Sequence, residues 1–184
     1  MTTIVSAPAA LAERIAAVAL VNGPFVLGDG HQLSSYFDEY LLAADPRLLT
    51  DTAHAMTALL PANAEVLAGV ELGGIPLAVA LSAATGLPLS FVRHQPKEYG
   101  SLRQFEGAEI QGRRVVLVDD VVRSGASLLL AARRLRIAGA KVTDTVCVLE
   151  RALGGQVLLA EHRLALRPLL TEADLPDVKA GERA

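Results

Sequence analysis

Hydrophobic positions recur along the chain in two patterns. Near the N-terminus, Leu11, Ile15 and Val18 recur at helical spacing, which predicts a helix over residues 8–21. Further along, short apolar runs alternate with helical stretches. The predicted strands are residues 65–70, 87–92, 115–118, 142–149 and 163–169, and the predicted helices are residues 46–60, 75–85 and 127–138. Apolar strands separated by helices predict an α/β fold in which helices cover both faces of a parallel sheet.

Two segments depart from this alternation. Residues 25–27 and 35–37 read as short strands around the turn at residues 28–30, which predicts a small N-terminal lobe. Residues 93–114 are rich in charge and lack hydrophobic periodicity, which predicts a functional loop. With no repeat or interdomain linker, we expect a single domain over residues 1–184. Its N-terminal lobe covers about residues 1–45 and its α/β core about residues 62–170.

Composition excludes several classes of protein. The chain has 184 residues, a net charge of −3, 4% aromatic residues and no Trp, which argues against a nucleic-acid-binding surface. Its one cysteine, Cys147, excludes a disulfide framework and a cysteine-based zinc site. No apolar run reaches the roughly 18 residues of a membrane span, and the N-terminus lacks a basic signal-peptide region. We therefore expect a cytoplasmic protein with no membrane partner.

Candidate chemistry is densest where the strand at 115–118 meets the following helix. Asp119 and Asp120 come directly after the valine-rich strand, and Gly125 lies just before the helix. Helix N-termini with free N–H groups bind anions, and glycine lets the backbone approach a phosphate closely. Carboxylates suit sugar hydroxyls or a hydrated Mg²⁺. The segment therefore predicts a site for a phosphorylated sugar, although a capped, solvated strand end would explain an isolated Asp pair equally well.

The segment 115–127 resembles the signature with which type I phosphoribosyltransferases bind 5-phosphoribosyl 1-diphosphate (PRPP). Three more stretches resemble the orotate branch of that family: residues 93–100 its basic catalytic loop, residues 25–38 its N-terminal hood, and residues 69–76 its pyrophosphate loop. The resemblance covers about residues 20–155. It implies the type I phosphoribosyltransferase fold. It also implies transfer of phosphoribose from PRPP to orotate, giving orotidine monophosphate and pyrophosphate.

The resemblance also implies roles for individual residues. The expected catalytic residues are Lys97, Asp119 and Asp120, with the two aspartates holding Mg²⁺ mainly through water and PRPP. The expected PRPP-binding residues are Leu72, Gly73, Arg93, His94, Lys97, Tyr99, Asp119, Asp120, Val121, Val122, Arg123, Ser124, Gly125, Ala126 and Ser127. The expected orotate-binding residues are Tyr36, Phe37, Arg123 and Arg151. Members of this group work as homodimers, so we expect the loop at 93–107 to reach the neighbouring subunit's site.

Some positions depart from the family pattern, and several of the changes remove positive charge. They are Gly28, Gly73, His94, Tyr99, Arg123 and Glu150. Two other functions therefore stay open: a related transferase that acts on another base or small acceptor, and a regulator that binds PRPP or a nucleotide without turnover. Arg93 and Lys97 favour an enzyme, because a sensor has less need to stabilise a leaving group. The segment 93–114 carries five Lys or Arg residues against three Glu, so a basic loop faces an acidic strand end.

Overall fold

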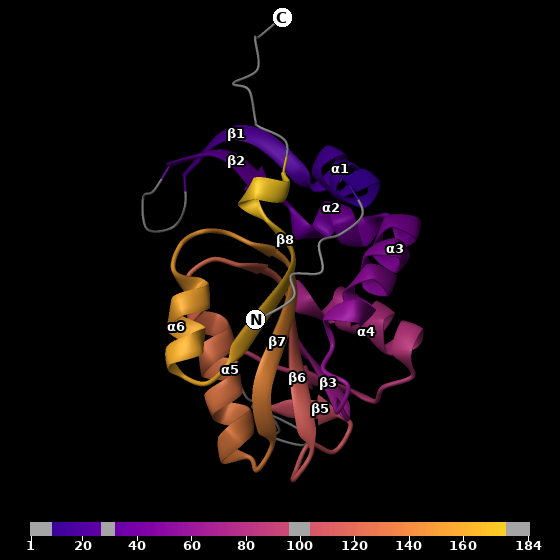
Figure 1. Ribbon diagram of the computed structural model, residues 1–184, viewed down its shortest axis with the longest axis vertical. Coiled ribbons are helices and arrows are strands. Elements are labelled where there is room, and N and C mark those ends of the chain that lie inside the picture. The colour runs from indigo at the N-terminus through magenta and orange to yellow at the C-terminus, as the bar shows by residue number, and fades with distance from the viewer. Residues whose placement is uncertain (1–8, 27–31, 96–103, 176–184) are drawn as a thin grey trace, which may run out of the picture.

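The computed structural model describes residues 9–26, 32–95 and 104–175 (Figure 1). Its helices are α1 (Ala9–Ala19), α2 (Glu39–Ala44), α3 (Pro46–Met56), α4 (Gly74–Thr85), α5 (Ala126–Ile137) and α6 (Gly155–Glu161), with 3₁₀ turns η1 (Thr57–Leu59) and η2 (Glu172–Asp174). Its strands are β1 (Leu20–Val26), β2 (Gln32–Phe37), β3 (Val66–Val70), β4 (Leu89–Val92), β5 (Phe105–Gly107), β6 (Arg114–Val122), β7 (Lys141–Glu150) and β8 (Ala165–Thr171).

A six-stranded sheet in the order β5-β4-β3-β6-β7-β8 forms the centre of the molecule. Strands β3, β4, β6, β7 and β8 are parallel, and β5 pairs antiparallel with β4 at one edge. The predicted α/β class is confirmed, although the edge strand makes the sheet mixed. That strand lies inside the segment predicted to be a loop, where a run of only three residues is too short to show a period.

Two hydrophobic clusters cover the two faces of the sheet. Val116, Val118 and Val146 point toward α1, α3 and α4, whereas Val115 and Leu117 point toward α5 and α6. The alternation follows from the strand pleat, which directs successive side chains to opposite faces. Both faces of β6 are therefore buried along most of its length, which explains the valine-rich sequence that predicted this strand.

The N-terminal hairpin lies beyond one end of the sheet (Figure 1). Strands β1 and β2 pair antiparallel, as predicted, while the turn at residues 27–31 lies outside the described residues. The first helix ends at Ala19 and not at Val21 as predicted, because Leu20 and Val21 join the ladder with β2. Ile15 and Phe37 are buried in the same cluster as residues of α4, β6 and β8, so the hairpin and α1 share the core beneath them.

Two helices, α3 and α4, begin or end where the sequence predicted, whereas two short helices were not predicted. The Asp45 side chain accepts hydrogen bonds from Arg47 N and Leu48 N and so caps α3. Gly86 ends α4 with a φ of 73°. Helices α2 and α6 have six and seven residues and were not predicted, because so short a run shows little periodicity. Within the described ranges, no helix has the length and apolar character needed to cross a membrane.

Burial of the central strand predicts the largest loss of stability at Leu117, which is fully buried between β3, β7 and α5. We expect Leu117→Ala to lower the free energy of unfolding by about 2–5 kcal/mol, because it leaves a cavity as well as losing apolar contact. Chemical denaturation measures this change. Leu130→Ala on the exposed face of α5 is the matched control and should cost under about 0.5 kcal/mol; equal losses in the two variants would contradict this account.

Candidate active site

Asp119 and Asp120 lie within β6 and not in a loop after it. The sequence placed the end of this strand at residue 118, but the ladder with β7 continues to Val122, with Asp119 opposite Cys147 and Val122 opposite Glu150. The strand continues because β7 supplies backbone partners beyond the apolar run. Asp119 lines a cavity at the start of α5 and Asp120 lies against Gly73 and Glu39, yet the two carboxylates remain close enough that each affects the pKa of the other.

The carboxylate pair carries unfavourable charge in the folded protein. Burial raises the pKa of Asp119 well above the ordinary carboxyl value, and the neighbouring charge of Asp120 raises it further. Burial also raises the pKa of Asp120, although a hydrogen bond from Val121 N and the charge of Arg123 act in the opposite direction. Groups that resist ionisation in this way are poised to gain from a bound cation or from hydroxyl donors.

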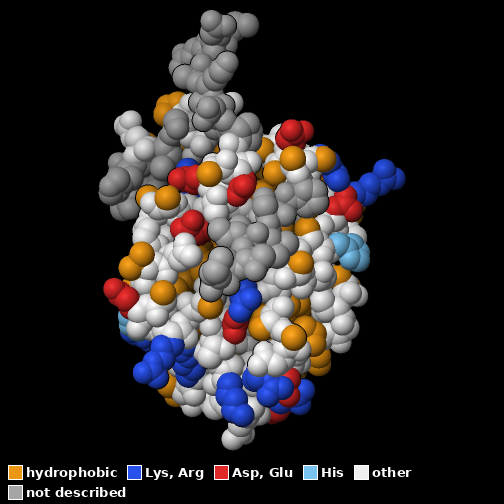
Figure 2. Space-filling model, in the orientation of Figure 1, with side chains coloured by type: hydrophobic (Ala, Val, Ile, Leu, Met, Phe, Trp, Pro, Cys, Tyr) orange, Lys and Arg blue, Asp and Glu red, His pale blue; other side chains and the backbone are white. Residues whose placement is uncertain are grey.

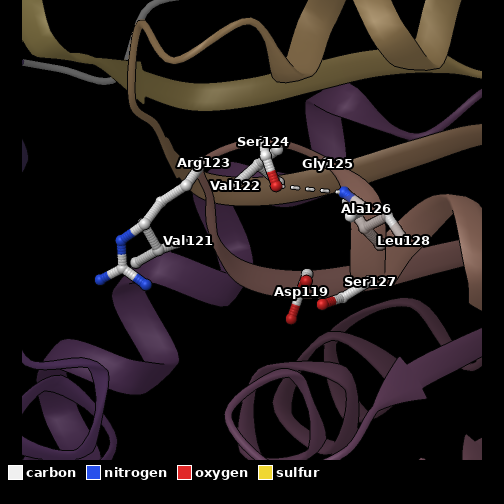
Figure 3. A pocket seen from close by; sticks show the side chains of 9 residues that line it. All are labelled: Asp119, Val121, Val122, Arg123, Ser124, Gly125, Ala126, Ser127 and Leu128. Atoms are coloured by element: carbon white, nitrogen blue, oxygen red, sulfur yellow. Dashed lines mark hydrogen bonds between the residues drawn. The ribbon is translucent and has the colours of Figure 1, made fainter. Parts of the chain in front are cut away.

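A cavity of about 210 Å³ lies between Asp119 and the start of α5 (Figure 3). Gly125 adopts a φ of 76° immediately before the helix, a conformation that disfavours other residues. Ser124 Oγ accepts a hydrogen bond of 3.5 Å from Ala126 N, and the Ser127 side chain lies beside Asp119. The structure thus gathers the segment Val121–Leu128 around one concave surface, as the phosphate-site prediction requires.

Arg123 points out of this cavity (Figure 3). Its guanidinium carbon lies 5.5 Å from the centroid of the Tyr36 ring in β2, within cation–π range. The Tyr36 ring also packs against Phe25, and the two ring centroids lie 5.6 Å apart. The sequence left open whether Arg123 meets the phosphate, the base site or solvent; the structure directs it toward the hood.

The two aromatic residues predicted at the base site differ in accessibility. Tyr36 is half-buried and meets Arg123, whereas Phe37 is 1% exposed and packs in the core with Ile15 and Leu42. Successive residues of a strand face opposite ways, so one of the pair had to point inward. Of the two, only Tyr36 therefore has a surface free for a ligand in this structure.

The predicted pyrophosphate loop lies directly against Asp120. A side chain at Gly73 would collide with the Asp120 carboxylate and would crowd the Cγ atom of Glu39, at 3.1 Å. Leu72 is 59% exposed beside it. Gly74 begins α4 against the backbone of β6, where a Cβ would strike the Val118 carbonyl. The absence of side chains at positions 73 and 74 is what allows this loop to approach the carboxylate pair.

Glu39 is a site residue that the sequence did not reveal. It begins α2, and burial together with the charge of Asp120 raises its pKa. No spacing links it to Asp120, because the two lie 81 positions apart and meet only when the hood packs on the sheet. Among the described residues, no cluster of three or more His, Cys, Asp or Glu side chains could hold a metal ion by itself.

The basic segment is only partly described. Arg93 is half-buried, its backbone N–H donates to the Gln104 carbonyl at 3.1 Å, and His94 is exposed next to it. Lys97 and Tyr99 lie outside the described residues. Beyond residue 103 the chain forms β5 and then buries Ile110, so the predicted loop is shorter than 93–114.

Arg151 lies just past β7, where its guanidinium forms an ion pair with Glu172 of η2. The arginine side chain is 12% exposed and the glutamate 44%. The burial of Glu150, with a contribution from the charge of Glu172, raises the pKa of Glu150. A ligand carboxylate that used Arg151 would therefore compete with Glu172.

Lys and Arg side chains gather at the end of the molecule opposite the hood (Figure 2). At that end, Arg113 and Arg114 lie 3.6 and 3.3 Å from the carboxylate of Glu65. This basic surface surrounds the beginnings of β6 and β7 and the end of α5, whereas the carboxylate pair lies near the opposite ends of the strands. It is therefore separate from the candidate active site.

Comparison with known proteins shows the family of the chain. Residues 46–158 match the phosphoribosyl transferase domain family. The orotate phosphoribosyltransferase of Nocardioides sp. is 45% identical over 167 residues, which cover 91% of this chain and 93% of that protein. The crystal structure of orotate phosphoribosyltransferase from Mycobacterium tuberculosis has a TM-score of 0.81 and 29% identity, covering 91% of this chain and 97% of that one.

A second structure of the Mycobacterium tuberculosis enzyme, in complex with PRPP, has a TM-score of 0.77 and 27% identity over 90% of this chain and 96% of that one. The matched domain includes β6, the start of α5 and the pyrophosphate loop, the elements that surround the carboxylate pair. The chain therefore belongs to the phosphoribosyltransferase family, in its orotate branch.

Proposed function

We propose that this protein transfers the phosphoribosyl group of PRPP to orotate, giving orotidine monophosphate and pyrophosphate in pyrimidine nucleotide synthesis. The observation that carries the proposal is the cavity at the start of α5, which places a helix N-terminus beside the Asp119 carboxylate, with Asp120 next to it in the strand. A phosphate and a diol separated by one sugar ring need this pair of features. Membership in the orotate branch supports the acceptor.

The phosphate cradle holds the 5′-phosphate in this proposal. The first turn of α5 lines the cavity, as an anion-binding helix N-terminus would, and the hydroxyls of Ser124 and Ser127 add donors. Gly125 lets a phosphate oxygen approach the backbone. Val121, Val122 and Ala126 shape the cavity wall without adding charge.

Asp119 and Asp120 hold the ribose hydroxyls, directly or through Mg²⁺. The donor set fits a hydrated Mg²⁺, because carboxylate oxygens are its preferred protein ligands and burial, which raises both pKa values, leaves the pair short of compensating charge. When bound, the metal neutralises charge on PRPP and on the departing pyrophosphate. The carboxylates also stabilise the positive charge that develops on the ribosyl ring as its bond to pyrophosphate lengthens.

Pyrophosphate is bound between the loop after β3 and the basic segment. Leu72 and Gly73 offer backbone N–H groups, and Arg93 and His94 adjoin them through Glu71. Lys97 and Tyr99 reach the leaving group from the loop, which in the dimer proposed below is the neighbouring subunit's. Lys97 is the proposed catalytic cation. The exposure of Leu72 and the absence of a side chain at Gly73 support this subsite.

The acceptor binds between the hood and the carboxylate pair. Tyr36 supplies an aromatic face, Phe37 supports it from the core, and Arg123 and Arg151 are the cations available for the orotate carboxylate. Bidentate pairing with a guanidinium would fix both the charge and the orientation of the flat ring.

The proposed organisation is one domain whose first 45 or so residues form the hood. The shared core of α1, β2 and the sheet supports it. We further propose a cytoplasmic homodimer in which the loop at 93–107 reaches the neighbouring subunit's site. Its charge supports that role, because Arg93, Lys97 and Arg103 lie in it against two glutamates.

The proposed activity predicts that the protein consumes orotate in the presence of PRPP and Mg²⁺. The change in ultraviolet absorbance of orotate measures this turnover. Uracil, hypoxanthine and adenine serve as alternative acceptors in parallel assays. We expect turnover with orotate alone, because the other bases lack a carboxylate for a buried cation to pair with. Turnover of another base in place of orotate would show a related transferase, and binding of PRPP with no turnover of any base would show a regulator.

The raised pKa of Asp119 predicts that removing its charge increases stability and lowers activity. A carboxyl group whose pKa is raised by folding adds stability below its unfolded-state pKa and loses that contribution as pH rises through the folded-state value. Asp119→Asn removes the charge, so we expect a higher melting temperature at neutral pH, at about 2–4 °C per kcal/mol for a chain of this size. We expect kcat to fall by about a hundredfold.

The same variant supplies its own control. As pH falls toward the ordinary carboxyl range, Asp119 becomes protonated and the two melting temperatures should converge. A difference in melting temperature that stays constant with pH would contradict a charge effect at Asp119.

The ion pair between Arg151 and Glu172 predicts opposite effects on acceptor affinity. If Arg151 binds the orotate carboxylate, Arg151→Met should raise the orotate KM about tenfold or more, as expected for loss of a charged hydrogen bond. Glu172→Gln should lower it, because the competing carboxylate is gone. Arg123→Met is the matched comparison: a rise in the orotate KM in that variant, with none in Arg151→Met, would assign the carboxylate to Arg123.

A further inference from the structure

The backbone of His94 is held from two sides by side chains of other elements. Its N–H donates to Oε2 of Glu71 at 2.8 Å, and its carbonyl accepts a hydrogen bond from Nη1 of Arg134 at 2.7 Å. Glu71 follows β3, and Arg134 lies in the last turn of α5. The two bonds thus fix one stretch of backbone between a sheet strand and a helix, without using the His94 side chain.

The neighbouring residue is fixed as well. Arg93 N donates to the Gln104 carbonyl at 3.1 Å, and Nε2 of Gln104 donates back to the Arg93 carbonyl at 3.2 Å. Residues 93, 94 and 104 form a stem where the chain leaves β4 and returns toward β5. Four hydrogen bonds, two of them to charged side chains, set the position of this stem.

Glu71 links the stem to the proposed pyrophosphate subsite. Its backbone N–H donates to the Val92 carbonyl at 3.0 Å, while its side chain reaches His94. The next two residues are Leu72 and Gly73, and Gly73 lies against the Asp120 carboxylate. One residue therefore joins the end of β4, the stem and the loop that faces the carboxylate pair.

A carboxylate at this position needs a reason, because it adds negative charge beside a subsite proposed for an anion. Repulsion would weaken binding of pyrophosphate unless the carboxylate has another use. Its hydrogen bond to the His94 N–H is that use, since hydrogen bonds to charged acceptors are stronger than neutral ones. Arg134 places a positive charge on the other side of the same residue.

We propose that Glu71 and Arg134 are positioning residues: they hold the His94 backbone so that the basic segment starts beside Leu72 and Gly73. The inference rests on the proposed function and deepens its pyrophosphate subsite. Helix α5 therefore has two uses in this arrangement: its first turn forms the phosphate cradle, and its last turn carries Arg134, which holds the stem.

The test measures binding of pyrophosphate and of ribose 5-phosphate by calorimetry with Mg²⁺ present. It compares the wild-type protein with its Glu71→Ala and Arg134→Ala variants. We expect the dissociation constant of pyrophosphate to rise about tenfold in each variant, the effect of losing one charged hydrogen bond. The dissociation constant of ribose 5-phosphate should not change, because this ligand occupies the phosphate cradle and the carboxylate pair but not the pyrophosphate subsite. The kcat with orotate should fall in parallel with pyrophosphate affinity.

Conservative variants separate positioning from charge. Glu71→Gln keeps an acceptor oxygen and Arg134→Lys keeps a donor, so both should retain most of the pyrophosphate affinity. The double alanine variant should bind pyrophosphate only slightly less tightly than the more impaired single variant, because loss of either hydrogen bond already frees the His94 backbone. Arg133→Ala is the matched control, since Arg133 precedes Arg134 on α5 but bonds to His162.

Several outcomes would overturn the inference. Wild-type pyrophosphate affinity in both alanine variants would do so, and so would a Gln variant as impaired as the Ala variant. Tighter pyrophosphate binding in Glu71→Ala would show that the carboxylate merely repels the ligand. If the wild-type protein forms no orotidine monophosphate but the variants still lose pyrophosphate affinity, the proposed function fails and this inference stands.

Discussion

The extension of β6 past its apolar run is the constraint on which the site depends. Residues 115–118 are buried on both faces, and the strand would be expected to end where charge begins. Backbone bonding to β7 carries it four residues further, so that Asp119 and Asp120 are fixed to the sheet and not to a loop. Burial makes both carboxylates unfavourable as charged groups and raises both pKa values, and the charge of Asp120 adds to the rise at Asp119.

The neighbouring elements take their places around that pair. Asp119 lines the cavity at the start of α5, and Asp120 beside it lies against Gly73 and Glu39, so one strand borders both the cavity and the hood. Gly73 and Gly74 let the loop after β3 approach, because no side chain separates it from β6. A substrate with a phosphate, a diol and a pyrophosphate matches this order of subsites along one edge of the sheet.

Positive charge is distributed unusually around the site. Gly73 leaves the pyrophosphate loop without a cation, while Arg123 leaves the cavity and lies over Tyr36. Arg151 is engaged by Glu172, and Glu71 and Arg134 are engaged with the His94 backbone. Most of these charges thus hold other parts of the protein in place before substrate arrives, which reduces the reorganisation that binding requires.

The sequence by itself determined the parts that rest on local chemistry. Valine-rich runs predicted the central strands, Asp45 with Pro46 marked the start of α3, and Gly125 after the Asp pair marked the segment that lines the cavity at the start of α5. Tertiary structure decided the rest. The length of β6 depended on β7, the direction of Arg123 on Tyr36, and the nearness of Glu39 to Asp120 on the packing of the hood. Those features arise from contacts between residues far apart in the chain, which hydrophobic period and local motifs do not encode.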